Sequence, residues 1–184
     1  GSIGSALARL LAECGPARLV LFEQSEYNLF RIERELRASF PGVPLVPLLG
    51  DVSRAGDIDA ACERTQPDVV YHAAAYKHVT MAERAVLSAV STNVFGTWHA
   101  ARAAAACGAR FVLVSTDKAA QPLSVMGATK RLVELVALTA AGSPAGVVAV
   151  RFGNVLGSSG SRLELLLEQM RRGRPIELTD PDAT

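Results

Sequence analysis

Short apolar runs alternate with longer amphipathic segments along almost the whole chain of 184 residues. Runs such as 18–23 and 110–115 have the length and apolar character of strands buried in a parallel sheet. Segments such as 26–38 place apolar residues three or four positions apart, as helices with one buried face do. Strands that alternate with helices form βαβ units with right-handed crossovers. The pattern therefore predicts an α/β fold built on a doubly wound parallel sheet.

The same pattern sets the expected bounds of each element. Strands are expected at 18–23, 45–49, 68–73, 110–115 and 147–151, and a further one is expected to begin at 176–178. Helices are expected at 6–14, 26–38, 56–65, 85–107, 125–141 and 161–172. Gly108 follows the longest helix and is expected to cap its C-terminus, because glycine adopts the left-handed conformation there at little cost.

Composition excludes several classes of protein. The formal net charge is +1 and 20% of the residues are charged, so no surface suited to nucleic acid or anionic lipid is expected. The three cysteines are scattered and lack a CxxC spacing, which predicts no disulfide framework, no bound metal and a reducing compartment. No run reaches the ~18 apolar residues of a membrane-spanning helix. We therefore expect a cytoplasmic domain that contacts no membrane within these residues.

The chain opens on half of a glycine-rich phosphate-binding loop. Gly1-Ser2-Ile3-Gly4 leads directly into the first expected helix. Glycines let the backbone approach a pyrophosphate, and a helix N-terminus offers unpaired N–H groups. A plain N-terminal turn or a cloning remnant would explain the same residues. Because the strand and first glycine of such a loop are absent, we expect a domain truncated at both ends, with its first, central strand missing and a gap in the sheet.

A carboxylate stands where a dinucleotide-binding fold needs one. Glu23 ends the first expected strand and lies 19 residues after Gly4. This spacing is expected for an acid that accepts hydrogen bonds from the adenosine ribose hydroxyls. Because a carboxylate there would repel a 2′-phosphate, NAD is expected in preference to NADP. A solvated carboxylate at a strand end is the alternative.

Two later strand ends offer further cofactor positions. Asp51 follows the strand at 45–49, and ligands of doubly wound sheets bind beyond the carboxyl ends of the strands. Asp51 is therefore expected to reach the adenine amino group. Ala73, Ala74 and Ala75 end the strand at 68–73, where small side chains leave room for a cofactor against the backbone. A turn-forming aspartate and simple tight packing remain as alternatives.

Five segments, in order, resemble one family. They are 21–29, 72–78 (HAAAYKH), 115–118 (STDK), 125–130 (VMGATK) and 151–160 (RFGNVLGSSG). Together they resemble the polysaccharide-biosynthesis branch of the UDP-N-acetylglucosamine 4,6-dehydratases, in the extended short-chain dehydrogenase/reductase superfamily. The resemblance runs from Gly1 to about Pro181 and implies that Gly1 and Gly4 end the family's TGxxGxxG loop. It also implies that the closing substrate domain has its first elements near 155–184 and continues beyond them.

The resemblance implies ligands as well as a fold. The implied cofactor is tightly held NAD, the implied substrate is a UDP-sugar, and a homo-oligomer is expected; larger members carry membrane helices ahead of this domain. The implied cofactor-binding residues are Gly1, Ser2, Ile3, Gly4, Glu23, Asp51, Val52, Ala73, Ala74, Ala75, Asn93 and Lys130. The implied substrate-binding residues are Lys77, His78, Asn154, Ser158 and Ser159. Asn93 resembles the residue that steadies the strand at 68–73, although an ordinary buried asparagine is the alternative.

A 4,6-dehydratase performs three linked steps. Hydride leaves carbon 4 for NAD, the new ketone acidifies the carbon 5 hydrogen so that water leaves from carbon 6, and hydride returns to carbon 6. The protein must supply two bases and an acid. Asp117 and Lys118 follow Thr116 at a strand end, and with the resemblance we expect Asp117 as the acid and Lys118 as the carbon 5 base. We expect both to be neutral at rest, sharing one proton in a dry pocket. A surface ion pair is the alternative.

The usual catalytic tyrosine is absent. Most of the superfamily has tyrosine four residues before its active-site lysine, but Met126 precedes Lys130 here, and a thioether accepts no proton. One interpretation is a pseudoenzyme that only binds nucleotide. The other is the active, methionine-bearing branch of the dehydratases, which the presence of Asp117 and Lys118 favours. The base for the 4-hydroxyl stays open between an ordered water, Lys130 and Asp117.

The preferred function is therefore conversion of UDP-N-acetylglucosamine, or a close UDP-HexNAc, to a 4-keto-6-deoxy sugar for surface polysaccharide. A UDP-sugar 4-epimerase shares the fold and the first hydride transfer but needs no elimination pair. A non-catalytic nucleotide-sugar-binding module would bind the same ligands without turnover.

Overall fold

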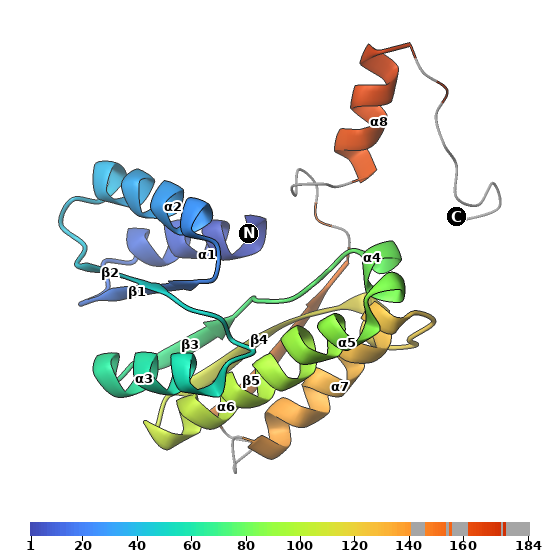
Figure 1. Cartoon of the computed structure of the whole chain (residues 1–184). Coiled ribbons are helices and arrows are strands. Elements are labelled where there is room, and N and C mark those ends of the chain that lie inside the picture. The colour runs from blue at the N-terminus through green and yellow to red at the C-terminus, as the bar shows by residue number, and fades with distance from the viewer. Residues whose placement is uncertain (141–145, 154, 156–161, 174, 176–184) are drawn as a thin grey trace. The chain divides into compact units, whose positions relative to one another are not determined.

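A computed structural model describes residues 1–140, 146–153, 155, 162–173 and 175. The chain divides into two units, Gly1 with Ile3–Gly153 and Ser2 with Asn154–Thr184. The alternation of strands and helices is as the sequence predicts (Figure 1). In the second unit the structure describes helix α8 (Arg162–Arg171). The strand expected at 176–178 and the substrate-side residues Asn154, Ser158 and Ser159 lie outside the described residues.

The first sheet has two parallel strands, β1 (Leu19–Glu23) and β2 (Leu45–Leu49). Helices α1 (Ser2–Glu13) and α2 (Glu26–Ser39) pack on it, so the first helix begins four residues earlier than expected. The shared core consists of Ala8, Ala12, Leu19, Leu21, Leu29, Ile32 and Leu36. Helix α2 begins almost directly after β1 because Ser25 Oγ accepts a hydrogen bond from Asn28 N at 3.3 Å.

The second sheet has three parallel strands in the order β3 (Val69–His72), β4 (Arg110–Thr116) and β5 (Val147–Phe152). Helices α6 (Gly96–Ala106) and α7 (Val125–Ala140) pack on one face of it, and α3 (Ala55–Thr65) packs against α6 (Figure 1). Phe111 and Leu113 of β4 are buried against alanines of α6 and against Val133 of α7. The alanines let α6 lie close to the sheet.

The two sheets are separate hydrogen-bonded units. Among the described strands β1 pairs with β2, β3 pairs with β4, and no described strand lies between β1 and β3. The α/β fold with parallel strands is therefore confirmed, and so is the interruption expected in its sheet.

One helix differs from its prediction. Instead of a single helix over 85–107, the chain forms α4 (Val79–Arg84), α5 (Val86–Ala89), a π-helical turn (Val90–Phe95) and α6. The extra residue in a π turn changes which side chains face inward, and such turns are frequent at functional sites. At its end a β-carbon on Gly96 would lie 2.8 Å from Val52 Cγ2, so the helix can pass there only without a side chain. Gly108 has φ of +72°, which confirms its expected capping conformation.

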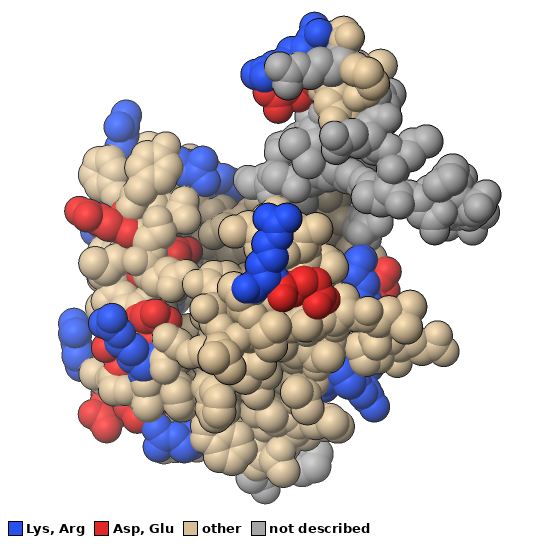
Figure 2. All heavy atoms as spheres, turned by 45° about the vertical axis from the view of Figure 1, so that its right-hand side comes forward, with Lys and Arg blue, Asp and Glu red and all other residues tan. Residues whose placement is uncertain are grey.

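Charged side chains are spread over the surface. On the face shown in Figure 2, acidic and basic residues are interspersed and uncharged residues make up most of the described surface. No described helix is both long and apolar enough to cross a bilayer.

Candidate active site

A pocket lies beside the N-terminal part of α1, the end of β1 and the first turns of α2. It is lined by Gly1, Gly4, Ser5, Ala8, Leu21, Glu23, Asn28 and Ile32. The structure therefore brings Gly1, Gly4 and Glu23 together, while Ser2 and Ile3 lie half-buried in the first turn of α1. A β-carbon added at either glycine would meet nothing within 4 Å. Close packing within the described protein therefore does not explain why Gly1 and Gly4 are glycines. The need to leave space for a phosphate group would explain it.

Glu23 is held at the end of β1 by the residues around it. Ser25 N donates to Glu23 Oε1 at 3.0 Å, and Glu23 lines the same pocket as Gly1 and Gly4. This geometry places a carboxylate beside the N-terminus of α1, where a ribose would lie next to a pyrophosphate. Asn28 and Ile32 also line this pocket and were not predicted to do so. Their spacing of four residues, which puts both on one face of α2, was the available signal.

Asp51 and Val52 both have structural partners. Asp51 Oδ1 accepts from Ser53 N at 2.9 Å, and Asp51 N donates to Asp57 Oδ2 at 3.0 Å. The turn-forming role of Asp51 is therefore present, and its contact with adenine stays a prediction. Val52 is buried and packs against Gly96 of α6. This packing fixes the loop after β2 to the helix that carries the π turn.

Asn93, in the π turn, holds the chain that follows β3. Its Oδ1 accepts from Tyr76 N at 2.8 Å, and its Nδ2 donates to Tyr76 O at 3.2 Å and to Thr129 Oγ1 at 3.0 Å. The amide oxygen and both amide hydrogens are thus used within the protein. Asn93 therefore steadies the backbone after 73–75, the segment expected to face a cofactor, and ties it to α7 next to Lys130.

Lys130 reaches from α7 to the end of β4. Its Nζ donates to Val114 O at 3.0 Å, and the residue is only 8% exposed. Burial lowers its pKa to about 8, although Glu134 acts in the opposite direction. A lysine with such a pKa releases a proton near neutral pH more readily than a solvated one. Glu134, one turn later on α7, is a buried carboxylate to which sequence analysis gave no role.

His72, at the end of β3, is enclosed by protein. Its Nε2 lies 3.0 Å from Thr97 Oγ1, whose proton is donated to Asn93 O at 2.6 Å. Nε2 therefore carries the hydrogen, and the ring also stacks on Phe111 with centroids 5.6 Å apart. Burial, together with the charge of Lys130, lowers the pKa of His72 to about 3. The imidazole is neutral at physiological pH and serves to hold β3 against α6.

Asp117 and Lys118 form the expected pair, in a short 3₁₀ turn (Asp117–Ala119) directly after β4. Lys118 Nζ lies 3.1 Å from Asp117 Oδ1, which also accepts from Thr116 Oγ1 at 2.8 Å and from Lys118 N at 2.8 Å. A β-carbon added at Gly153, just past the end of β5, would lie 3.6 Å from Asp117 Oδ2. The pair therefore stands where the carboxyl ends of β4 and β5 meet.

The expectation that Asp117 and Lys118 are both neutral at rest is wrong. The Asp117 and Lys118 side chains are 57% and 42% exposed, so the pair is not in a dry pocket. Hydrogen bonds from Thr116 and then Lys118 lower the pKa of Asp117. The resting pair is an ion pair, because solvent and these donors stabilise the carboxylate. Asp117 would become an acid only after a bound sugar and cofactor displaced water from it.

The remaining predicted residues have different surroundings. Met126 is 4% exposed and packs with Ala82 and Ala89, so it fills the space below the site. Lys77 and His78 are exposed in the segment after β3. Their approach to a sugar stays a prediction.

The whole chain, residues 1–184, matches the family described as Polysaccharide biosynthesis protein. The chain belongs to this family. Among curated relatives it is 39% identical over 188 residues to the capsular polysaccharide biosynthesis protein CapD of Staphylococcus aureus, covering all of this chain and 31% of CapD. It is also 36% identical over 157 residues to a UDP-glucose 4-epimerase of Rickettsia massiliae, covering 83% of this chain and 46% of that enzyme.

Two solved structures share the fold. Pen from Bacillus thuringiensis superimposes with a TM-score of 0.87 at 34% identity, covering 98% of this chain and 55% of Pen. The dTDP-glucose 4,6-dehydratase DesIV from Streptomyces venezuelae, solved as a double mutant with NAD bound, gives a TM-score of 0.79 at 24% identity, covering 100% of this chain and 63% of DesIV. The fold is therefore that of extended short-chain dehydrogenases/reductases. The chain spans about a third of CapD and about half of Pen.

In this family member, Gly127 lets α7 approach the Asp117–Ala119 turn. A β-carbon at Gly127 would lie 2.8 Å from Lys118 O and 3.4 Å from Pro122 Cα. Both are backbone atoms, so a side chain could be accommodated only by moving the turn or the helix. The start of α7 is further fixed by Glu83 Oε1, which accepts from Val125 N at 2.7 Å.

Gly127→Ala in the full-length protein is expected to lower the free energy of unfolding by about 1–3 kcal/mol and the rate by about tenfold. The reason is displacement of Lys118. Urea unfolding and steady-state kinetics measure the two effects. Gly56→Ala in α3 is the matched control, because a β-carbon there meets nothing within 4 Å. Wild-type stability and rate in Gly127→Ala would show that the close approach has no consequence.

Proposed function

We propose that the full-length protein is an NAD-dependent UDP-sugar 4,6-dehydratase that makes a 4-keto-6-deoxy sugar from UDP-N-acetylglucosamine or a close UDP-HexNAc. The observation that carries the proposal is the contact between Asp117 and Lys118 where the carboxyl ends of β4 and β5 meet. Lys130 of α7 also donates a hydrogen bond to the last part of β4, at Val114 O. An elimination needs an acid and a base close to one sugar, and the Asp117–Lys118 pair supplies both. Membership of a polysaccharide-biosynthesis family supports a surface glycan as the destination of the product.

The chain's own residues would divide the work as follows. The chemistry that bound NAD would supply is hydride transfer, away from carbon 4 and back to carbon 6. Gly1, Gly4 and Glu23 would hold its adenosine diphosphate half, as their common pocket supports. Lys118 would remove the carbon 5 hydrogen as a proton, and Asp117 would protonate the leaving carbon 6 hydroxyl. Lys118 would then return a proton to carbon 5 when carbon 6 receives hydride. Lys130, whose pKa is lowered by burial, would accept the 4-hydroxyl proton directly or through water, with Asp117 as the alternative.

The proposed cofactor preference gives a test. Full-length protein freed of nucleotide is expected to bind NAD more tightly than NADP by about 1–3 kcal/mol, because Glu23 would repel a 2′-phosphate. Calorimetric titration with both nucleotides measures the difference. Glu23→Gln should narrow it, whereas Glu35→Gln, which removes the Arg9 ion pair on the next turns of α2, should leave it unchanged. Equal affinities in the wild type would remove Glu23 from its proposed role.

A UDP-sugar 4-epimerase is the second candidate, which the Rickettsia relative favours. Both enzymes oxidise carbon 4, but only the dehydratase eliminates water. Incubation of the full-length protein with UDP-N-acetylglucosamine, followed by NMR of the product, separates them. A 4-keto-6-deoxy product supports the dehydratase, and a 4-epimer that retains its 6-hydroxyl supports the epimerase. If the protein binds several UDP-HexNAc sugars but converts none of them, both candidates are rejected.

A further inference from the structure

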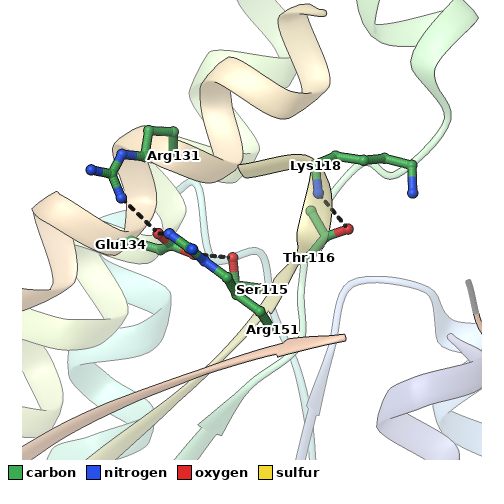
Figure 3. A network of polar contacts seen from close by, with 6 residues as sticks. All are labelled: Ser115, Thr116, Lys118, Arg131, Glu134 and Arg151. Carbon is green, nitrogen blue, oxygen red and sulfur yellow. Dashed lines mark hydrogen bonds and ion pairs between the residues drawn. The ribbon is translucent and has the colours of Figure 1, made fainter. Parts of the chain in front are cut away.

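Glu134 is a buried carboxylate for which the proposed mechanism has no use. It lies on α7 one turn beyond Lys130 and is 7% exposed. Ser115 Oγ donates to its Oε1 at 2.6 Å (Figure 3). Arg151 donates from Nε to Oε1 at 2.7 Å and from Nη2 to Oε2 at 2.6 Å. Arg131 adds a longer contact, Nη1 to Oε2, at 3.3 Å.

These contacts keep Glu134 ionised. Hydrogen bonds from Arg151 first, and then from Ser115, outweigh burial and lower the pKa of Glu134 to about 2. The two parallel bonds from Arg151 also fix the direction of the carboxylate, since the guanidinium plane matches its two oxygens. Glu134 is therefore ionised at neutral pH and held in one orientation on α7.

Glu134 joins the two strand ends that flank the catalytic pair. Ser115 and Arg151 are register partners on β4 and β5. Ser115 precedes Thr116 and Asp117 by one and two residues, and Arg151 precedes Gly153 by two. The paired part of the ladder ends at Thr116 and Phe152. Beyond that point, the hydrogen bonds described for the Asp117 carboxylate come from its neighbours Thr116 and Lys118. Ser115–Glu134 is thus a hydrogen bond between two buried side chains that ties β4 to α7 two residues before Asp117.

We propose that Glu134 is a positioning residue, which fixes Asp117 and Lys118 relative to Lys130 by clamping the ends of β4 and β5 to α7. This inference rests on the proposed function, because it assigns those three residues to the reaction. Glu134 itself touches none of the reacting atoms. It acts through Ser115 on one strand and Arg151 on the other.

The test compares three variants of the full-length protein. Glu134→Gln keeps the shape but loses the charge that accepts from Ser115 and both Arg151 donors. Ser115→Ala removes only the link to β4 and keeps the ion pair. Arg131→Ala removes the outer, longer contact and is the matched control. For the first two variants kcat is expected to fall about 10- to 100-fold, with KM and the NAD dissociation constant within about twofold of wild type. Arg131→Ala is expected to match wild type in all three quantities.

A merely structural ion pair predicts a different result. It would lower the thermal midpoint of Glu134→Gln but leave kcat of the folded protein, measured well below that midpoint, within about twofold of wild type; this outcome overturns the proposal. If Glu134→Gln fails to fold, Ser115→Ala decides alone. An unchanged kcat in folded Ser115→Ala overturns the proposal, and a lowered kcat at unchanged KM supports it.

A second measurement separates this inference from the proposed function. Amide hydrogen exchange of the peptide spanning 111–119, followed by mass spectrometry without substrate, needs no turnover. Exchange at 115–119 is expected to be at least about tenfold faster in Glu134→Gln and Ser115→Ala than in wild type and Arg131→Ala. Unchanged amide hydrogen exchange at 115–119 in both variants overturns the positioning role of Glu134, whichever product the enzyme makes. Absence of a 4-keto-6-deoxy product from wild type, with faster exchange in the two variants, rejects the proposed function and keeps the clamp.

Discussion

Replacing Asp117 with asparagine in the full-length protein is expected to slow water loss by about 10²–10⁴-fold, while the carbon 5 hydrogen still exchanges with solvent. The amide cannot donate a proton to the leaving hydroxyl as a carboxylic acid can. Lys118 would still remove the carbon 5 hydrogen from the 4-keto intermediate, so exchange would continue. Turnover in deuterated water, read by mass spectrometry of substrate and product, measures both processes.

Lys118→Met completes this test. It is expected to abolish carbon 5 exchange together with turnover, because the thioether cannot accept the proton. Arg110→Met is the matched control, since Arg110 is an exposed cation at the opposite end of β4 and is assigned no role in the reaction. Exchange at the wild-type rate in Lys118→Met would mean that another group is the carbon 5 base.

These expectations require a change at the site during the reaction. The described pair is solvent-exposed and ionised, with the pKa of Asp117 lowered by Thr116 and Lys118. A bound sugar and cofactor would remove water from both side chains, and loss of hydration raises the pKa of a carboxyl group and lowers that of an amine. Such a change would transfer the shared proton to Asp117. We therefore expect the neutral pair in the complex with sugar and cofactor and not in the resting protein.

The sequence was sufficient for the strands because each one is a continuous apolar run. The predicted strand at 45–49 coincides with β2, and the predicted helix at 125–141 agrees with α7 over the described residues 125–140. The π turn at Val90–Phe95 was not predictable, since one extra residue in a helical turn hardly alters a periodicity of 3.6. What requires the turn is tertiary: Asn93 must reach the backbone of Tyr76.

The site was predictable where one segment carries the chemistry. The sequence places Glu23 at a strand end next to the N-terminal glycines and Asp117 beside Lys118, and the structure has them so, while their roles stay predictions. Glu134, Ser115 and Arg151 were missed because their relation is a contact between three elements distant in the chain. Within α7 alone, Glu134 has the spacing of an exposed helix residue that pairs with Arg131. Only the packing of α7 on β4 and β5 reveals it as buried.

The stability of the protein is expected to depend on pH through His72. The pKa of this ring is about 3 in the folded protein, because it is buried and faces the charge of Lys130, against a reference value of 6.5. As pH falls through 6.5 the unfolded chain binds a proton at His72 that the folded protein does not bind. The stabilising contribution is therefore complete above pH 6.5 and is lost as pH falls toward 3. Between pH 6.5 and 4.5 the loss should reach about 2–3 kcal/mol, roughly 100-fold in the folding equilibrium.

His72→Gln isolates this contribution from the titration of carboxylates, because glutamine keeps an N–H donor toward Thr97 but does not titrate. Urea unfolding of full-length wild type and His72→Gln at several values between pH 7.5 and 4.5 measures the difference. The variant is expected to be less stable at pH 7.5, where its imperfect fit dominates, and the gap should narrow or reverse as pH falls. Thr97→Val, which removes the hydroxyl partner of His72 but keeps the imidazole, should retain the pH dependence of wild type at lower stability. Parallel curves for wild type and His72→Gln below pH 6.5 would mean that His72 binds its proton in the folded protein as easily as in the unfolded chain.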